Sequence, residues 1–530
     1  MNSNNNIFKY IFAAVVVCLI GYIMYIIVQN RSNVEEYDLD QTSTLSNIQT
    51  DLRFSIAELD TINPLLSKNR NVQEVTKMIY DSLITLNGNY KLEYSLAEEI
   101  AKTDNLTYVV KLRKGVLWED RTNFTAEDVK FTIEQLKWGG FESIYSENVK
   151  YIDYVEVIDS TSLKIVLTEP VTFFEYNLTF PIMSHSYYQD EDFAANTKRP
   201  IGTGMFKIAE ESSNVIKLVK NEYYWNVNKK PMATEVIINL YNTIGEAYTA
   251  FKNGELDILS VRISNVEDYI GLLGYDKIEY KARDFDFLSF NTAHTLLSDP
   301  VIRKAVSLVI DKNNIVATSL GKGYTPSNFC LDMGNWLYTK DMNIQTNTEE
   351  ATQLLMNNGW SYLNGVWQKR ENGTTKRLEF TLTVNSNNDK RVAAAENIKT
   401  QLATFGIPVT VKSVSADAYA DAINNRRYEC ALTGIRLGYS PSLTTFFAEG
   451  NIANYYNSEV SDIMNIISNT NDDGVLYEKY NRLYDIYLEE CPYIGLYRNT
   501  EVVVSNQNLV SNMTANCHNI YHNIEKWYRQ

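Results

Sequence analysis

The chain has 530 residues, with 49 Lys and Arg against 65 Asp and Glu, which gives a formal net charge of −16. Its hydrophobic content of 45% and charged content of 22% are ordinary for a globular protein, and its length suggests about three domain-sized units. The acidic balance and the lack of a basic run argue against a nucleic-acid-binding protein, because phosphate contacts need clustered Lys and Arg.

The first predicted element is an N-terminal membrane anchor. Residues 11–28 form an uncharged apolar run between Lys9 and Arg31, and about 20 apolar residues span a bilayer as a helix. A cleaved signal peptide needs a small-residue cleavage site, typically A-x-A, and none follows this run. A lipoprotein needs a small residue before its lipidated cysteine, whereas Cys18 follows Val17. We therefore expect an uncleaved anchor in residues 1–33, followed by a polar linker.

Residues 34–190 combine strands with helices. We expect short strands and a helix near residues 72–83, and an alternating strand at residues 108–113. Thr125 is a predicted N-cap, with Asp128 three residues on, where a capping acid belongs. The alternating segments 155–158 and 162–167 predict a hairpin.

Residues 191–283 continue the pattern, with strands at 215–219 and 235–240 and a helix at 244–253 that Gly254 closes. Strands that alternate with helices predict α/β packing.

Residues 284–499 open with a strand at 287–291 and a helix that Asp299 and Pro300 begin. A strand at 378–384, an amphipathic helix at 389–405 and a strand at 408–414 predict a βαβ crossover.

The sequence lacks the motifs of the common catalytic sites. It contains no H-E-x-x-H, no G-x-S-x-G and no G-x-x-x-x-G-K-[ST]. His518 and His522 stand four residues apart, a spacing that fits two metal ligands, but no third ligand is evident. The five cysteines form no C-x-x-C pair, so disulfides and buried free thiols both remain open. We expect neither an enzyme nor a cofactor.

A series of short motifs resembles one family. Residues 96–98 (LAE), 112–116 (LRKGV) and 125–131 (TAEDVKF) are similar to the extracytoplasmic solute-binding proteins of ABC importers, in the group that binds oligopeptides, dipeptides and nickel chelates. Further similar motifs follow the family's order at 59–65 (LDTINPL), 200–208 (PIGTGMFKI), 218–225 (LVKNEYYW), 250–258 (AFKNGELDI), 301–311 (VIRKAVSLVID) and 351–360 (ATQLLMNNGW).

The resemblance implies a two-lobed periplasmic-binding-protein type II-like fold of the α/β class. Lobe I would comprise residues 34–283, with an extra subdomain at 86–190, and would be completed by 500–530; lobe II would comprise 284–499. The protein would be the substrate-binding component of an ABC transporter, which captures a peptide or similar solute and delivers it to permease and ATPase subunits. Its globular part would lie outside the cell membrane. The alternative within the same fold is a peptide-sensing receptor coupled to signalling.

The resemblance also implies a ligand site. Residues 435–446 (IRLGYSPSLTTF) match a segment in which the family holds the free amine of a peptide with an aspartate. Here Gly438 occupies the aspartate's place and Tyr439 follows it. Arg436 lies two residues earlier, on the same face of a strand, and can meet a ligand carboxylate in a bidentate fork; a surface arginine on an outer loop is the alternative.

The remaining candidates come from the same resemblance. Lys68, Asn69 and Arg70 follow the turn at Asn63 and Pro64, where the family's first lobe faces its ligand. The other candidates are Tyr419 and Arg426 in lobe II and Tyr497 on the strand that returns to lobe I.

Overall fold

The computed structural model describes residues 50–189, 192–262, 274–331 and 334–529, and residues 50–529 form a unit of their own. The anchor predicted in residues 1–33 lies outside the described residues. No described helix combines the length and the apolar character that a membrane span requires.

One four-stranded sheet has the order β1-β10-β9-β8. It contains β1 (Asp51–Ala57), β8 (Phe206–Glu211), β9 (Val215–Lys220) and β10 (Glu235–Tyr241). β1 pairs in parallel with β10, and the other pairs are antiparallel. Helix α6 (Ile244–Lys252) follows, and Gly254 beyond it has a φ of 76°, as predicted for the residue that closes a helix.

A second four-stranded sheet has the order β4-β5-β7-β6. It contains β4 (Ala97–Lys102), β5 (Thr107–Leu112), β6 (Ile152–Asp159) and β7 (Ser162–Leu167), so the predicted hairpin is confirmed. Helix α3 (Ala126–Trp138) begins as predicted, because the Asp128 carboxylate accepts the backbone N–H of Thr125 at 2.7 Å.

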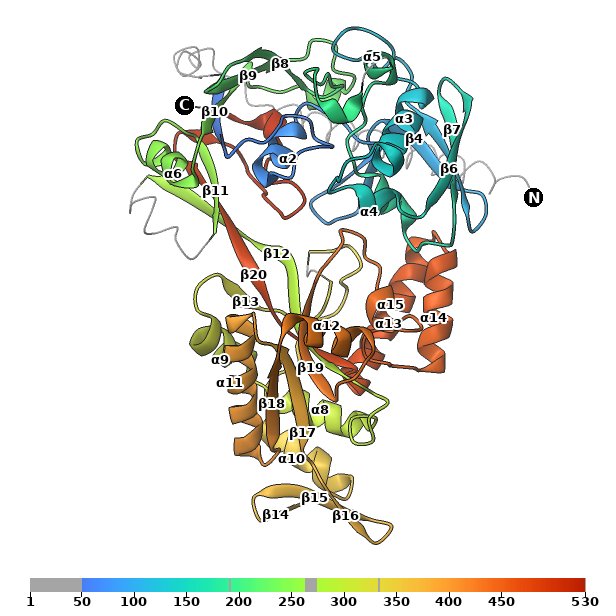
Figure 1. The fold of residues 1–530 in the computed structure, drawn as a ribbon, viewed down its shortest axis with the longest axis vertical. Helices are drawn as coiled ribbons and strands as arrows, with labels where there is room; N and C mark the ends of the chain where they lie inside the picture. The colour runs from blue at the N-terminus through green and yellow to red at the C-terminus, as the bar shows by residue number, and fades with distance from the viewer. Residues whose placement is uncertain (1–49, 190–191, 263–273, 332–333, 530) are drawn as a thin grey trace, which may run out of the picture. The chain divides into compact units, whose positions relative to one another are not determined.

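The largest sheet is built around two long strands, β12 (Tyr275–Phe290) and β20 (Tyr493–Asn506), which pair antiparallel along most of their length (Figure 1). Its order is β11-β20-β12-β19-β17-β18, with β13 (Tyr324–Pro326) paired to β20. β17 (Phe380–Asn385), α11 (Asp389–Phe405) and β18 (Val409–Val414) form the predicted βαβ unit, since β17 and β18 pair in parallel. β11 spans Ile258–Arg262 and β19 spans Cys430–Arg436.

The remaining elements cover these sheets or join them. Helix α8 (Pro300–Val309) begins at the predicted Asp299 cap. The other helices and strands are α2 (Arg70–Thr76), β2 (Ile84–Leu86), β3 (Leu92–Tyr94), α4 (Ser146–Val149), η3 (Phe174–Leu178), α5 (His185–Tyr188), η4 (Phe193–Ala195), η5 (Val227–Lys229), α9 (Lys312–Ile315), η7 (Val316–Leu320), α10 (Thr348–Asn357), β14 (Ser361–Leu363), β15 (Val366–Glu371), β16 (Thr374–Arg377), α12 (Ala416–Asn424), α13 (Thr444–Phe447), α14 (Ser458–Asn469), α15 (Asp473–Glu490), β21 (Leu509–Val510), η8 (Ile524–Lys526) and β22 (Tyr528–Arg529).

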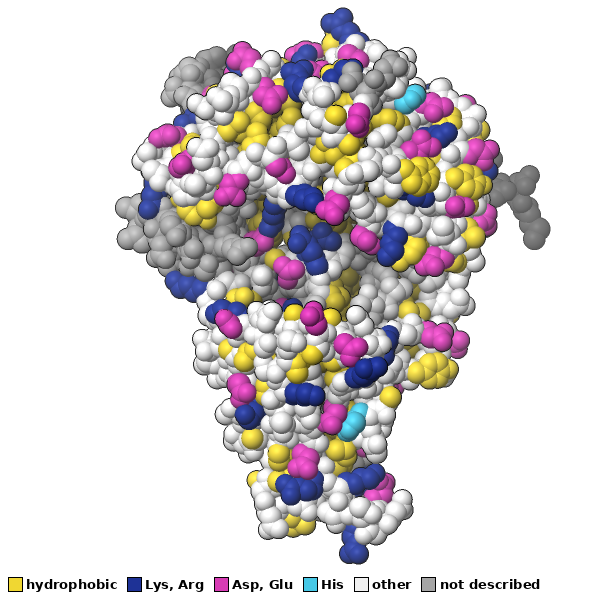
Figure 2. Space-filling model, in the orientation of Figure 1, with side chains coloured by type: hydrophobic (Ala, Val, Ile, Leu, Met, Phe, Trp, Pro, Cys, Tyr) yellow, Lys and Arg dark blue, Asp and Glu magenta, His cyan; other side chains and the backbone are white. Residues whose placement is uncertain are grey.

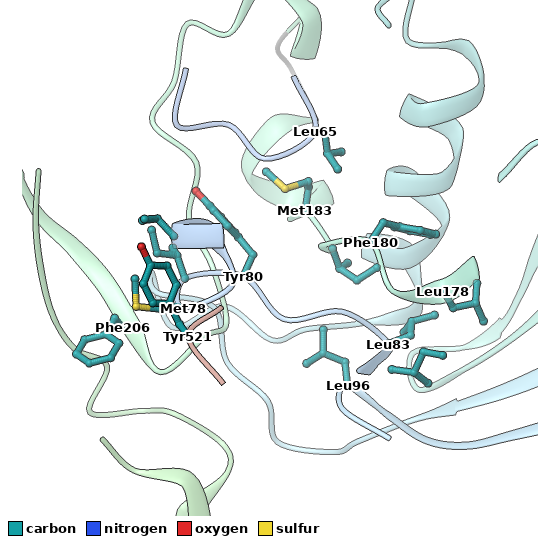
Figure 3. Close-up of a cluster of buried hydrophobic side chains, with 14 of the residues drawn as sticks. Leu65, Met78, Tyr80, Leu83, Leu96, Leu178, Phe180, Met183, Phe206 and Tyr521 are labelled. Atoms are coloured by element: carbon teal, nitrogen blue, oxygen red, sulfur yellow. The ribbon is translucent and has the colours of Figure 1, made fainter. Parts of the chain in front are cut away.

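Buried side chains form separate cores toward the two ends of the paired strands β12 and β20 (Figure 1). One core runs from Leu52 to Ile258 and takes in Val503 and the C-terminal segment from Leu509 to Trp527. Figure 3 shows Tyr521 of that segment packed beside Met78 and Tyr80. Two further cores use only residues between Phe285 and Tyr497. The C-terminus of the chain thus completes the core that its first half begins.

The helix expected near residues 72–83 is shorter and earlier than predicted. Helix α2 ends at Thr76, because the next carbonyls bond to another part of the chain. The Met78 carbonyl accepts from the Phe206 N–H at 3.0 Å, and the Ile79 carbonyl accepts from the Gly204 N–H at 2.9 Å. Backbone groups that are used in this way are lost to an intrahelical ladder.

Candidate functional site

The end of β19 and the loop after it line a cavity of about 90 Å³. Arg436, Gly438 and Tyr439 lie on this wall, and Ser440, Ser442 and Thr445 continue it. Tyr90 and Cys517, which belong to the core that contains the C-terminal segment or pack against it, also line the cavity. The cavity is therefore lined by residues from two separate cores.

Tyr439 joins the two walls. Its hydroxyl donates to the Cys517 carbonyl at 3.0 Å, and its ring meets the His518 ring edge-on at a centroid distance of 4.8 Å. The guanidinium of Arg283, on β12, lies 4.0 Å from the Tyr439 ring centroid and donates to the Leu437 carbonyl at 2.5 Å. A cation over an aromatic face is favourable, so Arg283 holds both the ring and the loop in place.

Several predicted site residues have structural contacts outside this cavity. Asn69 caps α2, since its side-chain oxygen accepts the Asn71 N–H at 2.8 Å. Lys68 pairs with Glu142 at 2.6 Å on the surface. Arg426 donates to the Asn451 and Gly450 carbonyls and so ties down the loop before α14.

Arg70 lies at the lobe I end of the long strands. Its guanidinium pairs with Glu501 of β20 at 2.5 Å and donates to the Tyr280 hydroxyl of β12 at 3.0 Å. The Tyr280 hydroxyl in turn donates to Glu501 at 3.0 Å. This network fastens the start of α2 to both long strands.

Tyr419 and Tyr497 lie near a partly buried ion pair that the sequence did not predict. Asp286 of β12 accepts from Arg391 of α11 at 2.5 Å. Burial raises the pKa of Asp286, and the Arg391 guanidinium opposes that rise. The Tyr497 hydroxyl is buried without a hydrogen-bond partner among the described residues. A carboxylate between two phenylalanines, Phe285 and Phe287, was the signal in the sequence that could have identified this cluster.

A second cavity, of about 170 Å³, lies beside α2. Asp81 is half-buried in its wall and accepts from Trp225 at 2.8 Å and from Thr203 at 3.0 Å. Burial raises the pKa of Asp81. His518 and His522 also line it. Among the described residues, no group of three or more His, Cys, Asp and Glu is placed to hold a metal ion.

The described cysteines are all buried, and Cys430 and Cys491 are free thiols. Burial raises the pKa of the Cys491 thiol, which makes it a poor nucleophile at neutral pH.

Burial holds the pKa of His518 well below 6.5, and the nearby charges of Lys77, Arg283 and His522 lower it further. Below pH 6.5 the unfolded chain therefore binds a proton here that the folded chain does not, so stability falls as the pH falls. We expect His518→Gln to lessen the loss of unfolding free energy between pH 7 and pH 5.5, by up to about 1.4 kcal/mol per pH unit. Urea unfolding of the original protein and the variant at both pH values measures this difference. An equal pH dependence of the unfolding free energy in the two proteins would contradict the low pKa of His518.

The chain is similar to known solute-binding proteins over most of its length. The family model for bacterial extracellular solute-binding proteins, family 5 (middle part), matches residues 91–453. Oligopeptide-binding protein AppA of Bacillus subtilis is 26% identical over 517 residues, which cover 89% of this chain and 90% of AppA. Glutathione-binding protein GsiB of Escherichia coli strain K12 is 24% identical, over 85% of this chain and 89% of GsiB.

A solved structure shares the fold. HbpA2 from Haemophilus parasuis superposes with a TM-score of 0.76 at 20% identity, over 91% of this chain and 100% of HbpA2. The family model covers more than half of the sequence. Its match and the mixed α/β architecture agree with the order of the motifs between residues 59 and 360. The chain belongs to the bacterial extracellular solute-binding proteins of family 5.

Proposed function

We propose that this protein captures a peptide or similar small solute between two lobes and delivers it to the permease of an ABC importer, whose ATPase subunits supply the energy. The related proteins AppA and GsiB are named for binding oligopeptides and glutathione, respectively, which supports a peptide-like ligand. The family consists of substrate-binding proteins rather than enzymes, in agreement with the expectation from the sequence.

We propose lobe boundaries that follow the buried cores. Lobe I comprises residues 34–283 and 500–530, with residues 86–190 as a subdomain, and lobe II comprises 284–499. The support is that the C-terminal segment packs into the core of the first half, while two other cores lie between Phe285 and Tyr497. In this division β12 and β20 are the strands that cross between lobes.

The observation that carries the proposal is the two-sided cavity at Tyr439. Its walls include Tyr90 and Cys517 on the lobe I side and residues 435–440 on the lobe II side. A ligand that contacts both walls binds the closed arrangement better than the open one, so binding and closure are one coupled equilibrium.

We propose a location outside the cell, tethered through residues 1–33. The apolar run at residues 11–28 and the extracellular description of the family support this.

Two measurements on the full chain test the proposed function. Mass spectrometry of the small molecules released on denaturation is expected to find a peptide-like solute, and calorimetry is expected to detect binding of pooled two- to six-residue peptides. A protein that releases no solute and binds no pool would contradict the proposal.

Of the predicted site residues, we propose that Arg436, Gly438 and Tyr439 contact the ligand, because the structure brings them to one cavity. Lys68, Asn69, Arg70, Tyr419, Arg426 and Tyr497 remain predictions.

Arg436→Ala is expected to weaken ligand binding at least tenfold, since a charge-assisted bond to a ligand group contributes about 1.5–3 kcal/mol. Arg427→Ala is the matched control, because Arg427 also lies in the proposed lobe II, outside the cavity, and is mostly exposed. Calorimetry with the released solute gives both dissociation constants. Equal affinities for the two variants would remove Arg436 from the site.

A further inference from the structure

The proposed subdomain of lobe I contacts the proposed lobe II at a place outside both cavities. Lys102 of β4 donates to the Ser468 carbonyl in the last turn of α14 at 3.0 Å, and the Thr172 and Ser468 hydroxyls lie 2.8 Å apart or less, at 2.7 Å. Lys91 pairs with Asp473, the first residue of α15. In Figure 1 the turn between α14 and α15 lies below β6 and β7 of the subdomain. None of these five residues is among the described residues that line either cavity.

Trp336 is the centre of a second group of contacts at the same boundary. Its backbone N–H donates to the Asn89 carbonyl at 3.0 Å, and its indole N–H donates to the Tyr176 hydroxyl at 3.1 Å. The Tyr176 hydroxyl donates in turn to the Tyr90 carbonyl at 2.9 Å, and Tyr90 lines the two-sided cavity. The contacts of Trp336 therefore lead to the wall of the proposed ligand site, although Trp336 itself does not line it.

Phe173 crosses the boundary with an apolar side chain. It packs against one of the two cores of the proposed lobe II, whereas the next residue, Phe174, belongs to the core of the proposed lobe I. The backbone of Phe173 has a φ of 57°, in the left-handed region that bulky residues rarely adopt. Such a conformation persists only where the surrounding structure holds it. The chain thus gives one ring to each lobe at this point, and its backbone is strained there.

These contacts exist only while the two proposed lobes are together, because each joins the subdomain to the other lobe. Figure 2 shows the surface hollowed at mid-height on one face, so the lobes meet along only part of their boundary. The ion pair of Lys91 with Asp473 is 44% and 49% exposed and contributes little by itself. The half-buried side chains of Phe173 and Trp336 and the charge-assisted bond from Lys102 contribute more.

A contact that is present only in the closed arrangement shifts the equilibrium between open and closed protein towards closure. A solute that binds the closed arrangement has an apparent dissociation constant that rises as the closed fraction falls. Because Lys102, Phe173 and Trp336 do not line the two-sided cavity, their effect on the closed fraction is the same for every solute. A residue that touches the solute would instead change the affinities of chemically different ligands by different factors.

We propose that Lys102, Phe173 and Trp336, through their contacts across the boundary, form a latch that sets the affinity of the ligand site without touching the solute. The inference rests on the proposed function and adds to it the residues that hold the lobes closed. Since Tyr176 bonds to both Trp336 and the Tyr90 carbonyl, closing the latch and completing the cavity wall are one event.

Lys102→Met and Phe173→Ala, alone and combined, test the latch by calorimetry with the full chain. The ligands are the released solute and individual peptides of different charge from the pool that binds. We expect each substitution to weaken binding at least about threefold and the pair at least about tenfold, by a common factor for all ligands. Lys111→Met is the matched control, because Lys111 lies on β5 of the same subdomain and pairs only within it, with Glu99. Its affinities are expected to equal those of the original protein.

Unchanged affinities in Lys102→Met and in the combined variant would overturn the latch and leave the proposed function standing. A loss confined to some of the ligands would also overturn it, because it would place these side chains in the ligand site. An original protein that binds neither solute nor peptide would contradict both the latch and the proposed function. Lys102→Met alone decides the outcome if Phe173→Ala does not fold.

A reversible lock tests the same contact in the opposite direction. Thr172→Cys combined with Ser468→Cys places two thiols where the hydroxyls now lie 2.7 Å apart, within reach of a disulfide. With solute bound, oxidation is expected to slow its release at least about tenfold, and reduction to restore the original rate. The original protein, treated in the same way, is the control. A pair that forms no disulfide, or a disulfide that leaves release unchanged, would show that the lobes do not close through this contact.

Discussion

Arg303→Met is expected to lower the free energy of unfolding by about 3–5 kcal/mol. Arg303 lies on α8, is 2% exposed and donates to four carbonyls, those of Leu297, Ser298, Glu490 and Cys491. Methionine fills similar space but donates nothing, so these buried acceptors lose their partners. Because Arg303 joins α8 to the end of α15, the substitution is expected to destabilise the proposed lobe II.

Urea unfolding followed by circular dichroism measures this change. Arg427→Met is the matched control, because Arg427 is 70% exposed and has a surface ion pair with Asp421 at 3.2 Å; such pairs contribute about 0–1 kcal/mol. Similar losses in the two variants would show that the carbonyl contacts of Arg303 do not stabilise the fold.

Gly202→Ala is expected to destabilise the protein by about 3 kcal/mol or more, at the upper end of overpacking effects. A Cβ at Gly202 would lie 1.8 Å from the Ile79 carbonyl oxygen. That oxygen is backbone, and it also accepts the Gly204 N–H at 2.9 Å. The clash can therefore be relieved only by moving the segment around Gly202 away from the segment around Ile79, in the proposed lobe I.

Gly88→Ala is the control for this substitution. No atom lies within 4 Å of a Cβ built at Gly88, and its φ is not positive. Its stability is expected to stay equal or to rise slightly, because alanine has less conformational freedom than glycine in the unfolded chain. A Gly202→Ala variant as stable as the Gly88→Ala variant, measured by the same urea titration, would refute the close approach at residue 202.

Local patterns in the sequence predicted much of the fold. The capping pair Thr125 and Asp128, the Asp299 cap, the hairpin of β6 and β7 and the parallel pairing around α11 all lie where the spacing of polar and apolar residues places them. Each depends on contacts within a few residues or within one strand pair. The family motifs, in addition, predicted the order of the elements along the chain.

Contacts between distant segments could not be predicted in this way. The early end of α2 follows from the bonds between residues 78–79 and 204–206, which no local pattern reveals. The pairing of Asp286 with Arg391 and the meeting of Arg283 with Tyr439 likewise join residues more than 100 positions apart. The motif at residues 435–446 indicated three residues of the cavity, but Arg283 and Arg498 carried no signal beyond their charge.

Hydrogen exchange with the full chain tests the central claim most directly, that one solute is held by residues of both proposed lobes. With the peptide pool that binds, we expect amide exchange to slow in residues 435–446 and, together with them, in the segments around Tyr90 and Cys517. Slower exchange on one side alone, or no change on either side, would contradict capture between two lobes.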